Sequence, residues 1–406
     1  MTPVADTAGL RAGNIARVLR EVRLRGETSR VTLAAALNLS PATVSAVIGD
    51  LLDQDLLLEK KAAPSPGRGR PQVMLSLNPA ARRVAGAKLN DGSITTAILD
   101  FKGEIISEGV APFDARQIDN DTFKSKVDEA LDAALSAADM RESQIDAFGI
   151  GVPGFIETDT GMCHWSPVLA APSVNVRGIL QQRLDCPIFV DNDANLATLA
   201  ELWFGLGREE SDFLVVTVEH GVGLGVVIDG RLFRGGRGLG AEFGHTKVQI
   251  DGALCRCGQR GCLEAYVADF ALLREAGAAL GGDVSGLDRA ELLNRLAAEA
   301  LGGAEAPMSI YHRAGRMLGL GLANLINIFD PALIVLAGER IRNHQLLASE
   351  IEKTLHANSI DVNRPDTPLA VHRWGDGLWA RGAGALALDG LMANMVARNQ
   401  PDEALP

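Results

Sequence analysis

The sequence predicts an α/β protein made of a small helical head and a larger two-lobed body that carries a metal-binding loop. Helical spacing followed by a short strand hairpin occupies residues 1 to about 83. Short apolar strands then alternate with amphipathic helices up to about residue 390, in an order that occurs twice. Three of the five cysteines lie within eight residues, 255–262, and a histidine precedes the first of them by ten residues.

Length and composition narrow the class of protein. A chain of 406 residues allows two or three domains, and 47% hydrophobic with 22% charged residues is typical of a soluble globular protein. The sequence has no N-terminal apolar segment of the kind that directs export and no run of eighteen apolar residues, so no membrane partner is expected. Five cysteines suit the reducing cytoplasm, where we expect this protein, with Cys163 and Cys186 as packing residues.

The charge is unevenly distributed between head and body. Residues 1–83 contain 12 Lys and Arg against 7 Asp and Glu, a net charge of +5. The remaining residues must therefore carry −17 to give the total of −12. A basic head on an acidic body indicates that the head alone meets a polyanion.

The head contains three predicted helices. Apolar residues at helical spacing indicate a first helix over Asn14–Arg25 and a second over Thr32–Leu37. A turn leads to a third helix, which Ser40 caps and Pro41 opens. Its inward residues are Val44, Val47, Ile48, Leu51 and Leu52, and its small or polar outward residues are Ala42, Thr43, Ser45 and Ala46.

Two predicted strands, Leu56–Lys61 and Gln72–Leu77, bracket a loop rich in glycine, proline and arginine. Arg68 and Arg70 on this loop suit insertion into a narrow minor groove. Three helices followed by such a wing are the pattern of a winged helix-turn-helix, which binds double-stranded DNA. The alternative is a helical protein–protein module with a solvated basic loop. The residues predicted to contact DNA are Ser40, Ala42, Thr43, Ser45, Arg68 and Arg70.

The body shows two successive sets of strands and helices. The first set comprises strands 84–89, 94–100, 104–110, 147–154 and 186–191 and helices 122–138, 176–184 and 194–204. The second comprises strands 213–218, 223–228, 231–233 and 333–337 and helices 310–329 and 344–356. Two halves with this order of elements predict an actin-like, ribonuclease-H-like duplicated fold with a cleft between two lobes.

The cysteine cluster predicts a metal loop in the second half. His245, Cys255, Cys257 and Cys262 offer one imidazole and three thiolates, the set that fills a tetrahedral Zn²⁺ site. With no open coordination position, the zinc would be structural. The alternative is that these are ordinary buried or free thiols. The same loop carries two carboxylates, Glu242 and Glu264.

This loop resembles a known family. Gly240–His245, together with the pattern Cys-x-Cys-Gly-x-x-Gly-Cys-Leu-Glu over 255–264, resembles the motif of the ROK family, which contains bacterial sugar kinases and sugar-responsive repressors. Leu39–Ser45 and Gly69–Pro71 resemble the winged heads of the repressors, which the kinases lack. The resemblance covers almost the whole chain and implies the same duplicated fold.

The resemblance also implies a sugar site. Asp191–Asn195 is similar to the family's Asn-Asp-Ala-Asn, whose Asp is the catalytic base in kinases. By this resemblance the sugar-binding residues are Gly154, Asn192, Asp193, Glu242, His245 and Glu264, with Asp193 as a vestigial base. Alternatively, Asp193 is the N-cap of helix 194–204 and Glu242 a solvated loop acid. Ser166–Leu169 departs from the family's Asn-Leu-x-Trp, which leaves the sugar open.

The phosphate-binding turns of the kinases are altered in this chain. The family's Asp-x-Gly-Gly-Thr is matched by Lys88–Ser93, and Gly-Thr-Gly by Gly221-Val222-Gly223 without its hydroxyl. Leu336–Glu339 keeps part of the adenosine contact. Loss of the carboxylate on the Mg²⁺ side argues against productive ATP binding, so we expect no enzyme activity.

The leading hypothesis is a DNA-binding transcription regulator, a repressor, that senses a carbohydrate. An ATP-dependent sugar kinase with a DNA-binding head is the alternative, and a sensor acting through a protein partner is a third. Because one modest head needs a second half-site, we expect a homodimer or a dimer of dimers. The expected domains are 1–83, 84–195 with 375–390, and 196–374, the last with the zinc loop, effector cleft and dimerisation surface.

Overall fold

A computed structural model describes residues 7–61, 73–114, 117–281, 284, 286–360, 366–372 and 377–398. The chain divides into two compact units, one formed by Met1–Asn192 with Trp379–Pro406 and the other by Asp193–Leu378. The backbone therefore passes from one unit to the other twice, between Asn192 and Asp193 and between Leu378 and Trp379.

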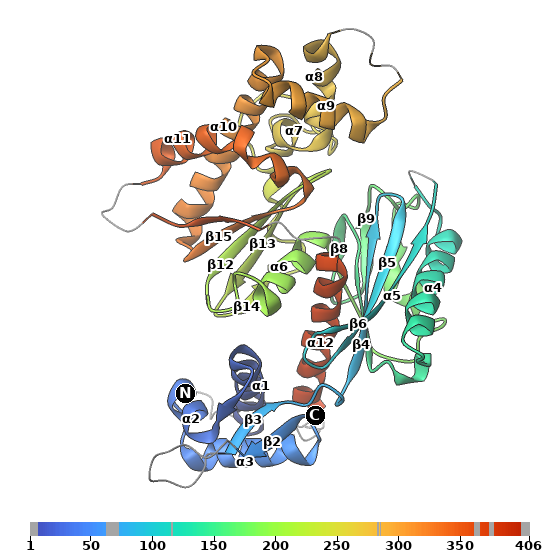
Figure 1. Ribbon diagram of the computed structural model, residues 1–406, viewed down its shortest axis with the longest axis vertical. Helices are drawn as coiled ribbons and strands as arrows, with labels where there is room; N and C mark the ends of the chain where they lie inside the picture. The colour runs from blue at the N-terminus through green and yellow to red at the C-terminus, as the bar shows by residue number, and fades with distance from the viewer. Residues whose placement is uncertain are drawn as a thin grey trace, which may run out of the picture. The chain divides into compact units, whose positions relative to one another are not determined.

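The described residues up to Leu77 form three helices and a hairpin (Figure 1). The elements are α1 (Thr7–Arg25), β1 (Thr28–Ser29), α2 (Arg30–Leu37), α3 (Pro41–Asp53), β2 (Leu57–Lys61) and β3 (Val73–Leu77). β3 pairs antiparallel with both β1 and β2. The predicted wing loop, with Arg68 and Arg70, lies outside the described residues. α1 begins before the predicted Asn14 because Ala12, 3% exposed, extends its buried stripe by one turn.

The predicted start and inner face of α3 are confirmed. Ser40 has an extended backbone, and its hydroxyl accepts a hydrogen bond of 3.1 Å from the Thr43 amide. Pro41 follows as the first helical residue, where its missing amide hydrogen costs nothing. Val44, Val47, Ile48 and Leu51 are buried, while Leu52 is half-buried.

The first lobe is built on a five-stranded sheet with the order β11-β7-β4-β5-β6. The strands are β4 (Arg83–Asn90), β5 (Ser93–Asp100), β6 (Ile105–Pro112), β7 (Ala147–Gly151) and β11 (Ile188–Asp191). Helix α4 (Asn120–Ala137) packs through Phe123 and Leu131 into the core formed with Ile98. Helix α12 (Gly377–Arg398) runs along the sheet (Figure 1). Gly86 of β4 lies directly against this helix.

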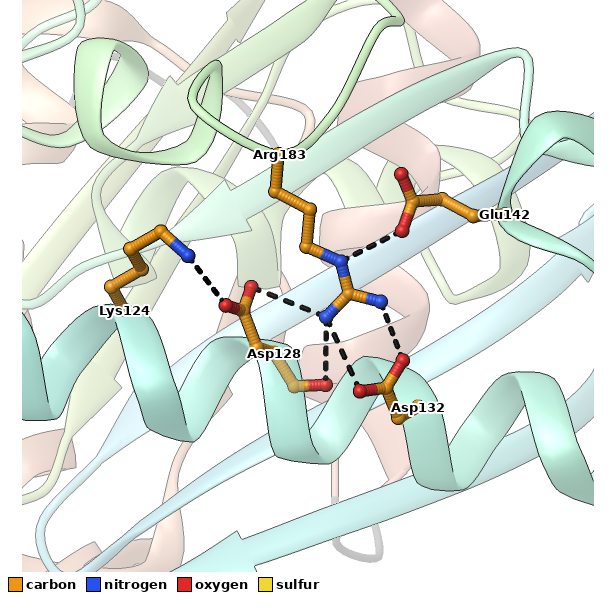
Figure 2. Close-up of polar contacts among 5 residues, drawn as sticks. All are labelled: Lys124, Asp128, Asp132, Glu142 and Arg183. Atoms are coloured by element: carbon orange, nitrogen blue, oxygen red, sulfur yellow. Dashed lines mark hydrogen bonds and ion pairs between the residues drawn. The ribbon is translucent and has the colours of Figure 1, made fainter.

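One arginine fastens the short helix α5 (Val176–Leu180) and its following turn to α4. The guanidinium of Arg183 donates to Glu142 at 2.7 Å, to the backbone carbonyl of Asp128 at 3.2 Å, and to Asp132 (Figure 2). Lys124 donates to the Asp128 carboxylate at 2.7 Å. Because Arg183 satisfies groups from two separate segments, this network fixes the turn that leads into β11.

The second lobe repeats the first. Its sheet has the order β14-β13-β12-β15-β16, so in both sheets the first strand lies between the second and the fourth, with the third and fifth at the edges. The strands are β12 (Phe213–Val218), β13 (Val222–Ile228), β14 (Arg231–Phe233), β15 (Leu333–Ala337) and β16 (Leu369–Val371). The helices are α6 (Asp193–Phe204), α7 (Glu264–Val267), α8 (Asp269–Leu280), α9 (Arg289–Leu301), α10 (Glu305–Phe329) and α11 (Ala348–Asn358). The predicted duplication is confirmed.

Some elements differ from the sequence-based expectation. The predicted helix from His344 begins at Ala348, because Asn343 has a non-helical backbone and the preceding turn, η3 (Glu339–Leu346), is a 3₁₀ helix. α5 ends at Leu180, four residues early. Sequence patterns did not indicate the three-stranded sheet of β8 (Phe155–Glu157), β9 (Met162–Trp165) and β10 (Val174–Asn175), nor α8 and α9.

Among the described residues, no single helix is long and apolar enough to cross a membrane. The bent pair α2 and α3, which meet at 119°, passes the same length and composition test when taken together.

Candidate metal centre and adjoining carboxylates

The metal loop begins at a 3₁₀ turn that rests on the sheet of the second lobe. In η2 (Phe243–His245), Phe243 is 3% exposed and Gly244 lies so close to β13 that a Cβ would come within 2.3 Å of the Val222 carbonyl oxygen. His245 is the last residue of this turn and is half-buried. The fixed turn therefore sets the position of the imidazole.

A tight turn over residues 254–262, the knuckle, brings the three cysteines to the histidine. The Cys255 amide donates to the Gln259 carbonyl at 2.8 Å, and isolated bridges pair Lys247 with Cys262 and Leu254 with Arg260. Gly261 has a φ of +77°, and a Cβ there would lie 1.8 Å from the Gln249 carbonyl oxygen, so only glycine fits. The knuckle thus folds back on the strand-like segment that follows His245.

The four predicted ligand side chains converge. One ligand atom from each of His245, Cys255, Cys257 and Cys262 lies within 4.8 Å of all the others. The Sγ atoms of Cys257 and Cys262 are 3.7 Å apart, and Cys255 Sγ lies 3.8 Å from His245 Nδ1. Sulfurs bound at about 2.3 Å to one tetrahedral ion stand roughly 3.8 Å apart. The cluster therefore has the spacing and donor atoms to hold one metal ion.

Charged groups surround this centre. Lys247 Nζ donates to Cys262 Sγ at 2.9 Å, and this hydrogen bond raises the pKa of the lysine. The Arg256 guanidinium lies 4.2 Å from the centroid of the Phe270 ring, which attaches the knuckle to α8. Glu264 Oε1 lies 3.8 Å from Cys255 Sγ, and its Oε2 accepts a hydrogen bond of 3.3 Å from the Val222 amide.

One carboxylate of the second unit, Glu264, lies beside the metal cluster, and the charges of Glu264 and Asp193 both act on a third carboxylate, Glu242. Partial burial raises the pKa of Glu242 to about 7, and the charges of Asp193 and Glu264 act in the same direction. Part of the Glu242 side chain still faces solvent. Asp193 is the first residue of α6, and its Oδ1 accepts from the Ala194 amide at 3.0 Å. It therefore lies inside the first turn rather than at the N-cap.

The other predicted sugar residues belong to the first unit. Gly154 has a φ of +131° and lies so close to β9 that a Cβ would be 2.0 Å from the Trp165 carbonyl oxygen. The backbone amide of Asn192 donates a hydrogen bond of 2.8 Å to the Asp191 carboxylate. The described contacts thus bring the four metal ligands together and place Glu264 next to Cys255. Asp193 and Glu264 are linked to Glu242 through the effect of their charges on its pKa.

Four of the six predicted DNA-contacting residues, Ser40, Ala42, Thr43 and Ser45, lie at the start of α3. Ala42 and Ser45 are exposed and Thr43 is half-buried. The Ser40 and Thr43 hydroxyls are 2.8 Å apart, so Ser40 takes part in capping the helix.

Three contacts of buried charged side chains, those of Lys88, Asp269 and Glu201, were not indicated by the sequence. Lys88, 5% exposed at the end of β4, places its Nζ 3.6 Å from the centroid of the Trp379 ring. The other two are His220 Nδ1 with Asp269 Oδ2 at 2.8 Å and His372 Nδ1 with Glu201 Oε1 at 2.6 Å. Their partners are 49 to 291 residues apart, so no local pattern could have shown them.

Comparison with known proteins agrees with this architecture. The model of the ROK family matches residues 91–389, and the chain belongs to this family. The xylose repressor of Caldicellulosiruptor bescii is 30% identical over 338 residues, which are 82% of this chain and 84% of that protein.

Two solved structures show how far the similarity extends. A ROK family transcriptional regulator, described as a homologue of the Escherichia coli MLC protein, has a TM-score of 0.79 at 25% identity and covers 96% of this chain and 99% of its own. A ROK hexokinase from Thermus thermophilus has a TM-score of 0.63 at 30% identity and covers 75% of this chain and 97% of its own.

Proposed function

We propose that this protein is a sequence-specific DNA-binding transcription regulator, a repressor of carbohydrate genes, whose body senses a sugar or sugar derivative. One observation carries the proposal: the regulator structure covers 96% of this chain, whereas the hexokinase, matched over nearly its whole length, covers only 75%. A kinase therefore accounts for the body and leaves about a quarter of this chain unmatched. Such a regulator would act on DNA in the cytoplasm.

The head supplies the DNA-binding function in this proposal. α1 to α3 with the hairpin β2–β3 have the order of a winged helix-turn-helix, and α3 would enter the major groove with Ala42 and Ser45 outward. Arg68 and Arg70 on the wing would enter the minor groove. Because α3 carries few long polar side chains, phosphate and wing contacts would supply much of the affinity, and two heads in a homodimer or dimer of dimers would read two half-sites.

The metal centre would hold Zn²⁺ with a structural role. Three thiolates and an imidazole suit zinc better than calcium or magnesium, which prefer oxygen ligands. His245, Cys255, Cys257 and Cys262 would occupy all four positions, so the ion would crosslink η2 to the knuckle. The loop that carries Glu242 and Glu264 would then be held in one conformation.

The effector would bind at the carboxylates beside this loop. Carboxylate oxygens accept hydrogen bonds from vicinal hydroxyls, and Asp193, Glu242 and Glu264 offer them from three segments. His245, Gly154 and Asn192 complete the predicted site. Glu264 also contacts the Val222 amide and lies near Cys255, so a bound sugar would act on both the β12–β13 turn and the metal loop.

Regulation requires the sugar to favour one conformation of the protein over another. We infer that sugar binding shifts the balance between two arrangements of the lobes, and that only one of them places two heads correctly on an operator. A tenfold change in DNA affinity needs about 1.4 kcal/mol of coupling, which a few hydrogen bonds made in one state only can supply.

A sugar kinase is the second candidate, because ROK hexokinases share the fold and Asp193 is present. Lys88 argues against it. Where the resemblance to kinases expects a carboxylate on the metal side, this chain has a buried ammonium over the Trp379 ring. A cation at this position would repel Mg²⁺. We therefore propose that the chain has no kinase activity.

The test is fluorescence anisotropy of the purified protein on intergenic DNA next to its own gene, titrated with free and phosphorylated sugars. Tight binding that one sugar shifts at least tenfold is the expected result. Asp193→Asn should abolish the shift without changing sugar-free DNA binding. Absence of specific binding would refute the regulator, and ATP-dependent phosphorylation that Asp193→Asn removes would establish the kinase instead.

A further inference from the structure

The metal loop contains a lysine that contacts a ligand sulfur. Lys247 Nζ lies 2.9 Å from Cys262 Sγ, 2.6 Å from Gln259 Oε1 and 3.4 Å from the His245 carbonyl oxygen. The three acceptors come from both halves of the loop. Lys247 follows His245 by two residues and pairs with Cys262 in an antiparallel bridge, so the backbone itself directs the side chain across the knuckle.

The charge of the centre explains what an ammonium would do there. A divalent ion with three thiolates and a neutral imidazole carries a net charge of −1, spread over the sulfurs. A hydrogen bond from a cation stabilises that charge and draws electron density from the sulfur, which then attacks protons and electrophiles less readily. Partners of this kind outside the ligand set contribute substantially to metal affinity.

Neighbouring cations are engaged elsewhere. The Arg256 guanidinium lies over the Phe270 ring, and Arg260 donates to the Gly252 carbonyl at 3.2 Å. Lys247, by contrast, donates directly to a ligand atom, and Gln259 holds its ammonium in place at the opposite side of the knuckle. Both side chains are otherwise exposed, so their placement is set by these contacts rather than by core packing.

We propose that Lys247 is a positioning residue of the zinc site: it neutralises the zinc–thiolate centre through Cys262 and so retains the ion and shields that thiolate, with Gln259 orienting it. This inference rests on the proposed zinc site. It assigns to Lys247 a role that differs from the ligand role of the four residues it adjoins.

The experiment compares Lys247→Met, Lys247→Arg and Gln259→Ala in the full-length protein. Lys353→Met is the matched control, because Lys353 is an exposed lysine paired with Glu350 on the surface of α11. Zinc affinity is measured by competition with a chromophoric chelator. Lys247→Met should weaken zinc binding by about 10- to 100-fold, Lys247→Arg and Gln259→Ala should do so less, and Lys353→Met should have no effect.

Alkylation by iodoacetamide, followed by peptide mass spectrometry, gives a second readout that loss of fold alone would not produce. In zinc-loaded Lys247→Met, Cys262 should react several-fold faster while Cys257 changes little. Equal zinc affinity and equal Cys262 reactivity in wild type and Lys247→Met would overturn the role of Lys247. A wild-type protein that binds no zinc would instead overturn the metal site itself, so the two failures can be told apart.

Discussion

At the scale of single residues, burial decides which cysteines can react. Cys163 is 1% exposed, and burial raises its pKa to about 11; burial raises the pKa of Cys186 to about 11 as well, helped by the charge of Glu142. An ordinary thiol has a pKa of about 8.5. These two thiols are therefore almost wholly protonated at neutral pH, and they are less accessible than Cys257, which is exposed.

This difference predicts a thiol titration with two classes. After zinc is removed by a chelator at pH 8, the exposed Cys257 should react rapidly with a disulfide reagent, whereas Cys163 and Cys186 should react slowly. The slow rate should rise about tenfold per pH unit up to about pH 10, since only the thiolate reacts. Unfolding in guanidinium is the control and should make all five fast. Five fast thiols in the native protein would contradict the assignment of Cys163 and Cys186 as packing residues.

Gly86 provides a residue-scale prediction about the first lobe. A Cβ at this position would lie 2.2 Å from the Gly384 amide nitrogen of α12, so Gly86→Ala should force β4 and α12 apart and cost about 1–3 kcal/mol of unfolding free energy. Gly49→Ala in α3 meets no atom within 4 Å and should instead stabilise its helix by up to about 1 kcal/mol. Urea denaturation measures both. An unchanged Gly86→Ala midpoint would contradict the close approach.

At the scale of elements, the sequence predicted the helices and strands that are marked by a local pattern of residues. β12 and β15 have the predicted bounds because each is an apolar run ended by turn residues, and β14 has them because the turn at Asp229 and Gly230 marks its start. β8 to β10 escaped prediction because two- to four-residue strands have too few side chains for a period to be visible, and they do not follow a predicted strand across a two-residue turn as the equally short β14 does. Likewise, the metal ligands were found because they are close in sequence, whereas Lys88 and Trp379 meet only through the fold.

α3 gives a prediction at this scale, because its cap contributes to the stability of the head and its exposed face to DNA binding. Ser40→Ala removes the bond to the Thr43 amide and should lower the stability of the head by about 1 kcal/mol, while Ser40→Asp should retain most of it. Ser45→Ala, on the exposed face, should leave stability within about 0.5 kcal/mol but weaken DNA binding. Thermal unfolding measures the change in stability, and fluorescence anisotropy measures the change in DNA binding. A stable Ser40→Ala would contradict the capping role.

The metal loop should be separable from the head in function. Cys257→Ser, or a chelator, should release the loop that carries Glu242 and Glu264 and weaken sugar binding at least tenfold. DNA binding without sugar should change little, because the head belongs to the other unit. Calorimetry with the active sugar and anisotropy on the operator measure the two effects. An equal loss of sugar binding and of sugar-free DNA binding would contradict a local role for the metal.

At the scale of the whole molecule, charge separates the two tasks of the chain. The head carries +5 and the rest −17, so only the head should attract DNA while the body repels it. Because the basic head would bind DNA by neutralising phosphates, the DNA affinity should depend on salt. The logarithm of the affinity should fall linearly with the logarithm of salt concentration, with a slope of about −0.9 for each phosphate neutralised.

The wing arginines should account for a defined part of that slope. Replacing Arg68 and Arg70 with alanine should weaken binding to all sequences and reduce the slope by up to about 2, since each lost contact releases about one fewer counterion. Lys126→Ala, which breaks a surface pair with Glu129 on α4, is the matched control and should change neither value. If instead the arginine variant kept the wild-type slope, the DNA-binding surface would lie elsewhere, and the head would have to act through a protein partner.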